Sequence, residues 1–276
     1  MDTLIKPKTT ANDLNAIIKG HLEELAKETD KARVSEEMVR YLEFCAKFGY
    51  QYSASNVFLI LLARPDASHV AGFNAWKQMG RFVKRGEKGI AILAPMLYRE
   101  DPDDEDSQKV LRGFRVVHVF DLGQTDGQPL PDPPSWKSPE KHNELQKKLM
   151  EFAELNGIKV TIEELQGETQ GISQGGSIVL SPEAGTKTLI HELAHELLHQ
   201  VENTHLSRAE KEMEAEAIGF IVSRYFEINE LASANYLSFF GISSEMIFSC
   251  FERIHKCASM IIGFILKNEN SWIEEI

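Results

Sequence analysis

The sequence predicts an α+β protein made of two domains, and three observations support this class. Apolar residues recur at helical spacing in long segments near both ends, β-branched segments lie between them, and a proline-rich segment divides the chain. Of the 276 residues, 42% are hydrophobic and 26% are charged. This composition is typical of a globular protein and excludes a disordered, collagenous or disulfide-stapled chain.

The first domain is expected to span residues 1–135. Its helices follow from apolar side chains three or four residues apart, such as Leu14, Ile18 and Leu22, and its strands follow from runs of β-branched residues. The acidic run EDPDDED at 100–106 is expected to form the loop of a hairpin between these strands. The expected helices are 11–29, 35–48 and 53–63, and the expected strands are GIAILAPMLY (89–98) and GFRVVHVFDL (113–122).

The second domain is expected to span residues 136–276. The segment QPLPDPPSWKSPEK at 128–141 contains five prolines, which stiffen a connection and cannot continue a helix or a central strand. Beyond it, helical spacing and short β-branched runs again occur together, so this domain is also α+β. The expected helices are 139–156, 185–202, 207–229 and 243–267, and the expected strands are IKVTIEE (158–164) and GSIVLSP (176–182).

The sequence gives no indication of export or membrane insertion. No segment approaches the roughly 20 consecutive apolar residues of a membrane-spanning helix, and the opening MDTLIKPKTTANDL lacks the apolar core of a secretory signal. Cys45, Cys250 and Cys257 have no CxxC spacing, so we expect small core or half-buried residues rather than disulfides or a zinc knuckle. The predicted location is cytoplasmic, with no membrane partner.

The net charge of −12 is distributed unevenly. Residues 1–135 carry 18 basic and 20 acidic side chains, whereas the remaining residues carry 12 and 22. Within the first domain, the stretch from Trp76 to Lys88 contains five basic side chains and a single acid, Glu87. The nearly neutral first domain can therefore present a basic patch.

The most informative segment is TLIHELAHELLHQ at 188–200, which contains an HExxH motif at His191, Glu192 and His195. Residues four apart lie on one face of a helix, so both imidazoles can bind a single metal ion. The Glu192 carboxylate can take a proton from a water molecule whose pKa zinc lowers toward about 7. The motif therefore predicts a zinc peptidase site, and the strand GSIVLSP before this helix can pair with an extended substrate.

A third metal ligand is required, and two glutamates are candidates. The HExxHxxGxxH arrangement needs a histidine at position 201, where the chain has Val201. Glu212 and Glu216 lie four residues apart on one face of the next predicted helix, whereas Glu214 points about 200° away. We assign Glu212 as the ligand and Glu216 as the residue that orients a ligand histidine, with Glu216 as the alternative ligand.

Two further histidines lie close to the motif in sequence. His199 is about two helical turns, roughly 11 Å, from His191, which is too far to share one ion comfortably. His205 lies in the following predicted loop, and a neutral imidazole there can hydrogen-bond a tetrahedral intermediate. The alternative for His205 is an ordinary loop residue.

The basic stretch combines positive charges with aromatic rings, which is typical of proteins that bind single-stranded nucleic acid. Basic side chains contact phosphates, and aromatic faces stack on unpaired bases. The alternatives are a solvated loop for the charges and core positions for Phe73, Trp76 and Phe82. The candidate nucleic-acid-binding residues are Tyr52, Asn56, Trp76, Lys77, Arg81, Lys84, Arg85 and Lys88.

The segment YSASNVFLILLARPDASHVAGFNAWKQMGRFVKRGEKGIAILAP at 52–95, together with VFDLGQTDGQPLP at 119–131, resembles the N-terminal domain of the ArdC-type antirestriction proteins. The second domain is similar to the zincin-type metallopeptidase domain of that family and to ImmA/IrrE-type proteases. The resemblance implies an N-terminal domain that binds single-stranded DNA and a C-terminal zinc metallopeptidase fold. It also implies that Glu192 is the general base and that His191, His195 and Glu212 bind the metal.

These features together predict a zinc metalloendopeptidase of the HExxH gluzincin type that binds single-stranded DNA. It would cleave a DNA-associated protein or protect DNA in an antirestriction role. A second hypothesis is a DNA-coating protein whose zincin domain is structural, and a third is a protease that DNA binding switches on. Two histidines and a carboxylate make Zn²⁺ the default cofactor, although the ligand identities alone do not choose it over manganese or cobalt. The expected partners are single-stranded DNA and an unidentified protein substrate.

Overall fold

The computed structural model describes residues 9–28, 30–100, 107–131, 135–200, 206–228 and 243–267. Within these ranges the protein has the α+β class that the sequence predicts. Most of the predicted acidic loop, residues 101–106, and His205 lie outside the described residues. No helix in the described ranges is long and apolar enough to cross a membrane.

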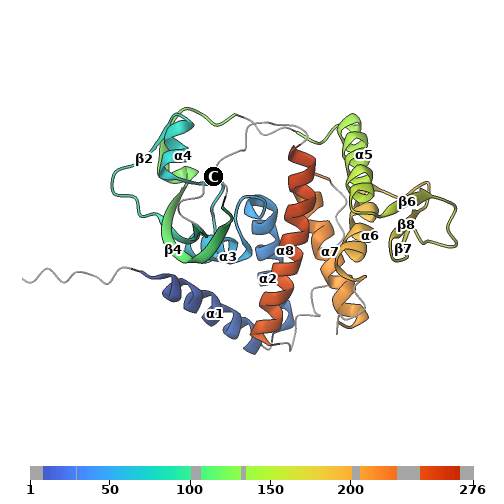
Figure 1. Cartoon of the computed structure of the whole chain (residues 1–276), viewed down its shortest axis with the longest axis horizontal. Helices are drawn as coiled ribbons and strands as arrows, with labels where there is room; N and C mark the ends of the chain where they lie inside the picture. Colours follow the sequence, from blue (N-terminus) through green and yellow to red (C-terminus); the bar gives the residue numbers. More distant parts are fainter. Residues whose placement is uncertain are drawn as a thin grey trace, which may run out of the picture. The chain divides into compact units, whose positions relative to one another are not determined.

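The chain divides into two compact units (Figure 1). The first unit consists of residues 1–24 and 55–131, and the second consists of residues 25–54 and 132–276. The second unit therefore includes residues 25–54, which the predicted border after residue 135 assigns to the first domain.

The first unit is built on an antiparallel hairpin of two long strands, β3 (Ile90–Arg99) and β4 (Lys109–Asp121). A short strand, β1 (Val70–Gly72), pairs with the other edge of β4 and gives the order β1-β4-β3. Both predicted strands are confirmed, and both are rich in β-branched and other apolar residues, which favour the strand conformation. The other elements that lie wholly or mostly in this unit are α1 (Ala11–Lys27), α3 (Ala54–Ala63), α4 (Phe73–Gln78), β2 (Arg81–Val83), η1 (Leu122–Gln124) and β5 (Thr125–Gly127).

The second unit combines helices with a small sheet of three strands. In this sheet β8 (Ser177–Leu180) is central, with β6 (Lys159–Ile162) parallel to it on one side and β7 (Gly171–Ser173) antiparallel on the other. The helices are α2 (Lys31–Phe48), α5 (Pro139–Leu155), α6 (Thr186–Leu198), α7 (Arg208–Tyr225) and α8 (Ser244–Lys267).

Helix α7 lies at the centre of the second unit. It contacts α2, α6 and α8, and α6 also contacts β7 and β8 (Figure 1). The first turn of α7 is fixed by a capping box. The Ser207 side chain accepts a hydrogen bond from the backbone amide of Glu210, and the Glu210 side chain accepts one from the backbone amide of Ser207. Helix α2 joins this unit through apolar contacts such as that between the rings of Tyr41 and Phe251, whose centroids are 4.2 Å apart. The result is a helical core that holds α6 and α7 side by side.

The three cysteines are free and buried, as the sequence predicts. Cys45 lies on α2, and Cys250 and Cys257 lie on α8. Burial raises the pKa of Cys45 and of Cys257 to about 12, so both thiols are protonated at neutral pH.

Candidate functional site

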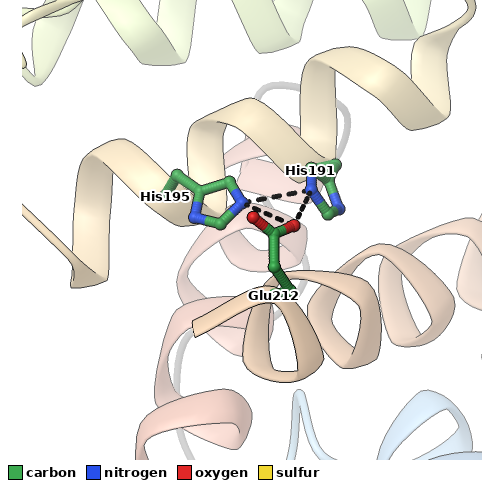
Figure 2. Close-up of side chains that lie close together, drawn as sticks. All are labelled: His191, His195 and Glu212. Atoms are coloured by element: carbon green, nitrogen blue, oxygen red, sulfur yellow. Dashed lines mark hydrogen bonds and ion pairs between the residues drawn. The ribbon is translucent and has the colours of Figure 1, made fainter. Parts of the chain in front are cut away.

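Helices α6 and α7 bring His191, His195 and Glu212 together (Figure 2). The two histidines lie one turn apart on α6, and their Nε2 atoms are 3.1 Å apart. Glu212 reaches them from the first turns of α7, with its Oε2 atom 3.5 Å from Nε2 of His191 and 3.5 Å from Nε2 of His195. The three ligand-type atoms form a nearly equilateral triangle.

This triangle has the dimensions of a metal site. Zinc binds histidine nitrogen and carboxylate oxygen at about 2.0–2.1 Å, so two ligand atoms of a tetrahedral site lie about 3.3 Å apart. The observed separations of 3.1, 3.5 and 3.5 Å match this value. Three protein ligands also leave the fourth position open, as in catalytic zinc sites. The donor set therefore fits a divalent metal ion.

Glu216 lies on the other side of the His191 ring from the triangle. Its Oε2 atom is 3.7 Å from Nδ1 of His191, and its Oε1 atom accepts a hydrogen bond of 2.7 Å from Lys187. The interaction with His191, together with Lys187, lowers the pKa of Glu216. Of the two candidate third ligands, Glu212 thus faces both Nε2 atoms, and Glu216 faces the nitrogen that orients His191.

His199 lies next to His195, a candidate ligand, but is not part of the triangle. The helix ends at Leu198, and His199 at its C-terminal cap places its Nδ1 atom 3.0 Å from Nδ1 of His195. Burial and the neighbouring His191 lower the pKa of His195 to about 4, so its imidazole is neutral at physiological pH. A neutral imidazole is the form that binds metals.

The predicted general base, Glu192, is buried beside the edge strand β7. Gly171 of this strand passes so close that a Cβ atom there would lie 2.8 Å from Cγ of Glu192. Burial raises the pKa of Glu192, and the carboxylates of Glu212 and Glu196 add to this effect. A carboxylate with a raised pKa is a stronger base, which suits the role of general base.

The sequence did not indicate the role of Glu196, which links α6 to the small sheet of the second unit. Its carboxylate accepts hydrogen bonds from Ser173 Oγ at 2.6 Å and from the backbone amides of Gln174, Gly175 and Gly176 at 2.9, 2.9 and 2.6 Å. Gly175 and Gly176 have φ values of 81° and 87°, a backbone conformation that favours glycine. The pair of glycines before β8 is the sequence signal that could have indicated this turn.

The position within the sheet of the strand that precedes α6 also differs from the prediction. GSIVLSP forms the central strand β8, so it is not the edge available to a substrate. The edge on the α6 side is β7, which the sequence analysis did not predict, and on its outer side β7 pairs with no strand of the described chain.

In the predicted nucleic-acid-binding stretch, two basic residues are engaged within the first unit. Arg81 donates to Thr125 Oγ1 at 2.9 Å, to the Thr125 carbonyl at 3.1 Å and to the Gln128 carbonyl, which links β2 to β5 and the residue after it. Lys84 donates to the Gly123 carbonyl at 3.0 Å. Both side chains hold the loop structure together.

Three other predicted residues, Lys77, Arg85 and Lys88, are exposed. Two aromatic rings of the same stretch are also exposed, Phe73 by 55% and Phe82 by 60%. Exposed rings between exposed cations are the combination that stacks on unpaired bases and contacts phosphates. We call these five exposed residues, which lie on α4, on β2 and in the turn that follows β2, the α4–β2 surface.

Trp76 and Asn56 are buried and do not belong to this surface, contrary to prediction, and Tyr52 is half-buried. Trp76 is 1% exposed and its indole donates to the Phe120 carbonyl at 2.9 Å, so neither face can stack on a base. Asn56 is buried, and its amide makes two hydrogen bonds, 2.8 and 2.9 Å, with the backbone of Leu93. Tyr52 lies in the second unit, and burial raises its pKa to about 12.

Fold and site together define a class: an α+β protein in which an HExxH helix and the following helix supply two imidazoles and a carboxylate for a divalent metal. Residues 12–121 match the family described as the N-terminal domain of anti-restriction factor ArdC. The chain therefore contains an ArdC N-terminal domain.

Other comparisons extend beyond that domain. The chain is 27% identical over 284 residues to an uncharacterized protein of Bacillus anthracis, an alignment that covers 84% of this chain and 48% of the relative. The chain thus spans about half the length of this curated relative. Two crystal structures of the antirestriction ArdC protein from plasmid R388 also match, one metal-free and one Mn(II)-bound. Their identities are 18% and 17%, their TM-scores are 0.43 and 0.42, and they cover 78% and 81% of this chain and 86% and 90% of theirs.

Proposed function

We propose that this protein is a zinc-dependent endopeptidase that binds single-stranded DNA and cleaves a DNA-associated protein, in an antirestriction role. The observation that carries the peptidase half is the triangle of His191, His195 and Glu212, whose 3.1–3.5 Å separations suit zinc, beside the buried carboxylate of Glu192. The match to the ArdC N-terminal domain and the α4–β2 surface support the DNA-binding half.

The chain's own residues provide the remaining parts of a peptidase mechanism. A divalent ion held by His191, His195 and Glu212 would polarise a substrate carbonyl and lower the pKa of a water molecule. Glu192 accepts the proton of the attacking water and delivers it to the leaving amine nitrogen. The outer edge of β7 pairs with the extended substrate backbone, and Glu196 holds that edge in place against α6.

The proposal is tested with a fluorescently labelled protein that is either free or bound to single-stranded DNA. The purified protein, loaded with one equivalent of zinc, is expected to cleave the DNA-bound substrate faster, because a shared strand raises the effective concentration of the substrate. Equal rates would contradict the role of DNA. No cleavage under any condition, with zinc or with manganese, would contradict the peptidase half.

The α4–β2 surface predicts a specific salt dependence of DNA binding. If Lys77, Arg85 and Lys88 each neutralise one phosphate, each contributes about −0.7 to the slope of log Kobs against log salt. Replacing all three with glutamine is therefore expected to reduce the magnitude of the slope by about 2. Fluorescence anisotropy with a labelled oligonucleotide at several salt concentrations measures both slopes.

A charge-matched control uses exposed lysines of the second unit. The triple variant Lys147→Gln/Lys159→Gln/Lys267→Gln removes the same charge, so its slope is expected to stay at the wild-type value. If both triple variants lose slope equally, net charge and not the α4–β2 surface determines DNA binding.

A further inference from the structure

A line of three hydrogen-bonded side chains runs from a candidate metal ligand into the core of the second unit. Nδ1 of His195 faces Nδ1 of His199 at 3.0 Å, and Nε2 of His199 faces Oε2 of Glu214 at 3.1 Å. Glu214 is 0% exposed and the side chain of His199 is 4% exposed. The line therefore begins at a ligand and ends on a fully buried carboxylate of α7.

The far oxygen of this carboxylate is held by helix α8. Oε1 of Glu214 accepts hydrogen bonds from Nε of Arg253 at 3.0 Å, from a terminal nitrogen of the same guanidinium, and from the Cys250 thiol at 2.9 Å. The donors named above include the guanidinium of Arg253, which is always protonated and pairs with this carboxylate. The ion pair favours the ionised form of Glu214, which only accepts hydrogen bonds.

The identity of each donor follows from this acceptor. Because the carboxylate only accepts, Nε2 of His199 carries the proton between them. A neutral His199 with its proton on Nε2 has a lone pair on Nδ1.

The same reasoning extends to the ligand. Two Nδ1 atoms 3.0 Å apart share one proton, and Nδ1 of His199 is the acceptor, so Nδ1 of His195 is the donor. A neutral His195 with its proton on Nδ1 has its lone pair on Nε2, the atom that faces His191 and Glu212. The direction of the hydrogen bonds thus prepares His195 for a metal.

We propose that His199 and Glu214 are positioning residues that hold His195 in the one tautomer able to bind metal, and that Arg253 sets the direction of this hydrogen-bond chain. The proposal rests on the metal site of the proposed function. Neither residue supplies one of the three ligand atoms: His199 contacts His195 at its other ring nitrogen, and Glu214 acts on His195 through His199.

The decisive variant is Glu214→Gln, which keeps the shape of the side chain. Arg253 only donates, so it would hold the amide oxygen of the glutamine and leave the NH₂ group facing His199. His199 would then accept at Nε2, carry its proton on Nδ1 and donate to His195, whose own proton would move to Nε2. This reversal would block the metal-binding nitrogen.

The first readout requires no metal. Long-range ¹H–¹⁵N spectra of the metal-free protein with labelled histidines distinguish protons on Nδ1 and Nε2. We expect the proton of His195 on Nδ1 in the wild type and on Nε2 in Glu214→Gln. A proton on Nε2 of His195 in the wild type would overturn the proposal, even if the variant did not fold, and so would identical tautomers in both folded proteins.

The second readout is zinc affinity, measured by competition with a chelator. Residues that orient a metal ligand typically contribute about 10- to 100-fold to metal affinity, so Glu214→Gln is expected to bind zinc more weakly by this factor. Glu214→Gln/Arg253→Met frees the amide to turn its oxygen toward His199, and it should recover part of the loss. Failure to recover would overturn the role of Arg253.

A matched control distinguishes the effect of hydrogen-bond direction from the effect of side-chain packing around Glu214. Cys250→Ala removes another contact of Glu214 but leaves the carboxylate in place, so zinc affinity and tautomers are expected to stay at wild-type values. An equal loss in Cys250→Ala would mean that packing around Glu214, and not its charge, matters. A wild type that binds no metal would overturn the proposed metal site itself, whereas a metal-binding wild type with an unaffected Glu214→Gln would overturn only this inference.

Discussion

Glu192→Gln is expected to keep its metal and to lose about 10²- to 10⁴-fold in the rate of peptide hydrolysis, the usual contribution of a general base. The substitution keeps the size of a side chain that is packed against Gly171, so β7 and α6 keep their positions. The amide cannot accept the proton of the attacking water. Rates on a DNA-bound labelled protein, compared with metal content by mass spectrometry, measure the effect.

A second glutamate near the start of α6 provides the control. Glu183→Gln makes the same chemical change at an exposed position before the helix, and it is expected to keep wild-type activity. Unchanged hydrolysis in Glu192→Gln would contradict the peptidase proposal. If Glu192→Gln still protects single-stranded DNA from a nuclease and the Lys77/Arg85/Lys88 variant does not, the coating hypothesis is favoured.

Glu212→Ala is expected to abolish metal binding in protein purified without added metal, from about one ion per chain to none detectable. Two imidazoles alone leave the site short of the three protein ligands that a catalytic zinc site requires. Glu212 is the residue whose carboxylate lies 3.5 Å from both Nε2 atoms, and its side chain is half exposed, so its removal leaves the core intact. Mass spectrometry of metal content checks this result.

Glu216→Ala is the matched comparison, one turn further along α7. Because Glu216 faces Nδ1 of His191, its loss is expected to weaken metal binding by about 10- to 100-fold without abolishing it. Retention of metal in Glu212→Ala, with loss in Glu216→Ala, would reverse the two assignments.

Long periodic segments determined how much of the fold could be predicted. The helices at 139–156 and 243–267 are found nearly at their predicted limits, because each buries a regular apolar face. The strand β3 also lies within one residue of its predicted limits, whereas β4 begins four residues before its predicted start. The structure adds β1, β2, β5 and β7, each three residues long. Such strands form through pairing with distant segments, which leaves no periodic signal in the sequence itself.

The candidate site was predictable where spacing along one helix places the residues. The HExxH histidines and the pair Glu212 and Glu216 follow from helical geometry alone. Glu196 bonds to a glycine turn, and Glu214 bonds to Arg253 of α8. These partners lie far away in the sequence, so the spacing of residues along one helix does not predict them. In the sequence, Trp76 lies among basic residues, which predicts that it stacks on a base. Only its burial against β4 shows that it does not.

The path of the chain limits how its gene can be rearranged. Residues 25–54 belong to the second unit although they lie between the two segments of the first. A recombination event at the proline-rich segment would deliver the metal-site half without α2, and the face of α7 that α2 covers would be left bare. A half cut from the other at this segment is therefore expected to be less stable than it is within the whole chain.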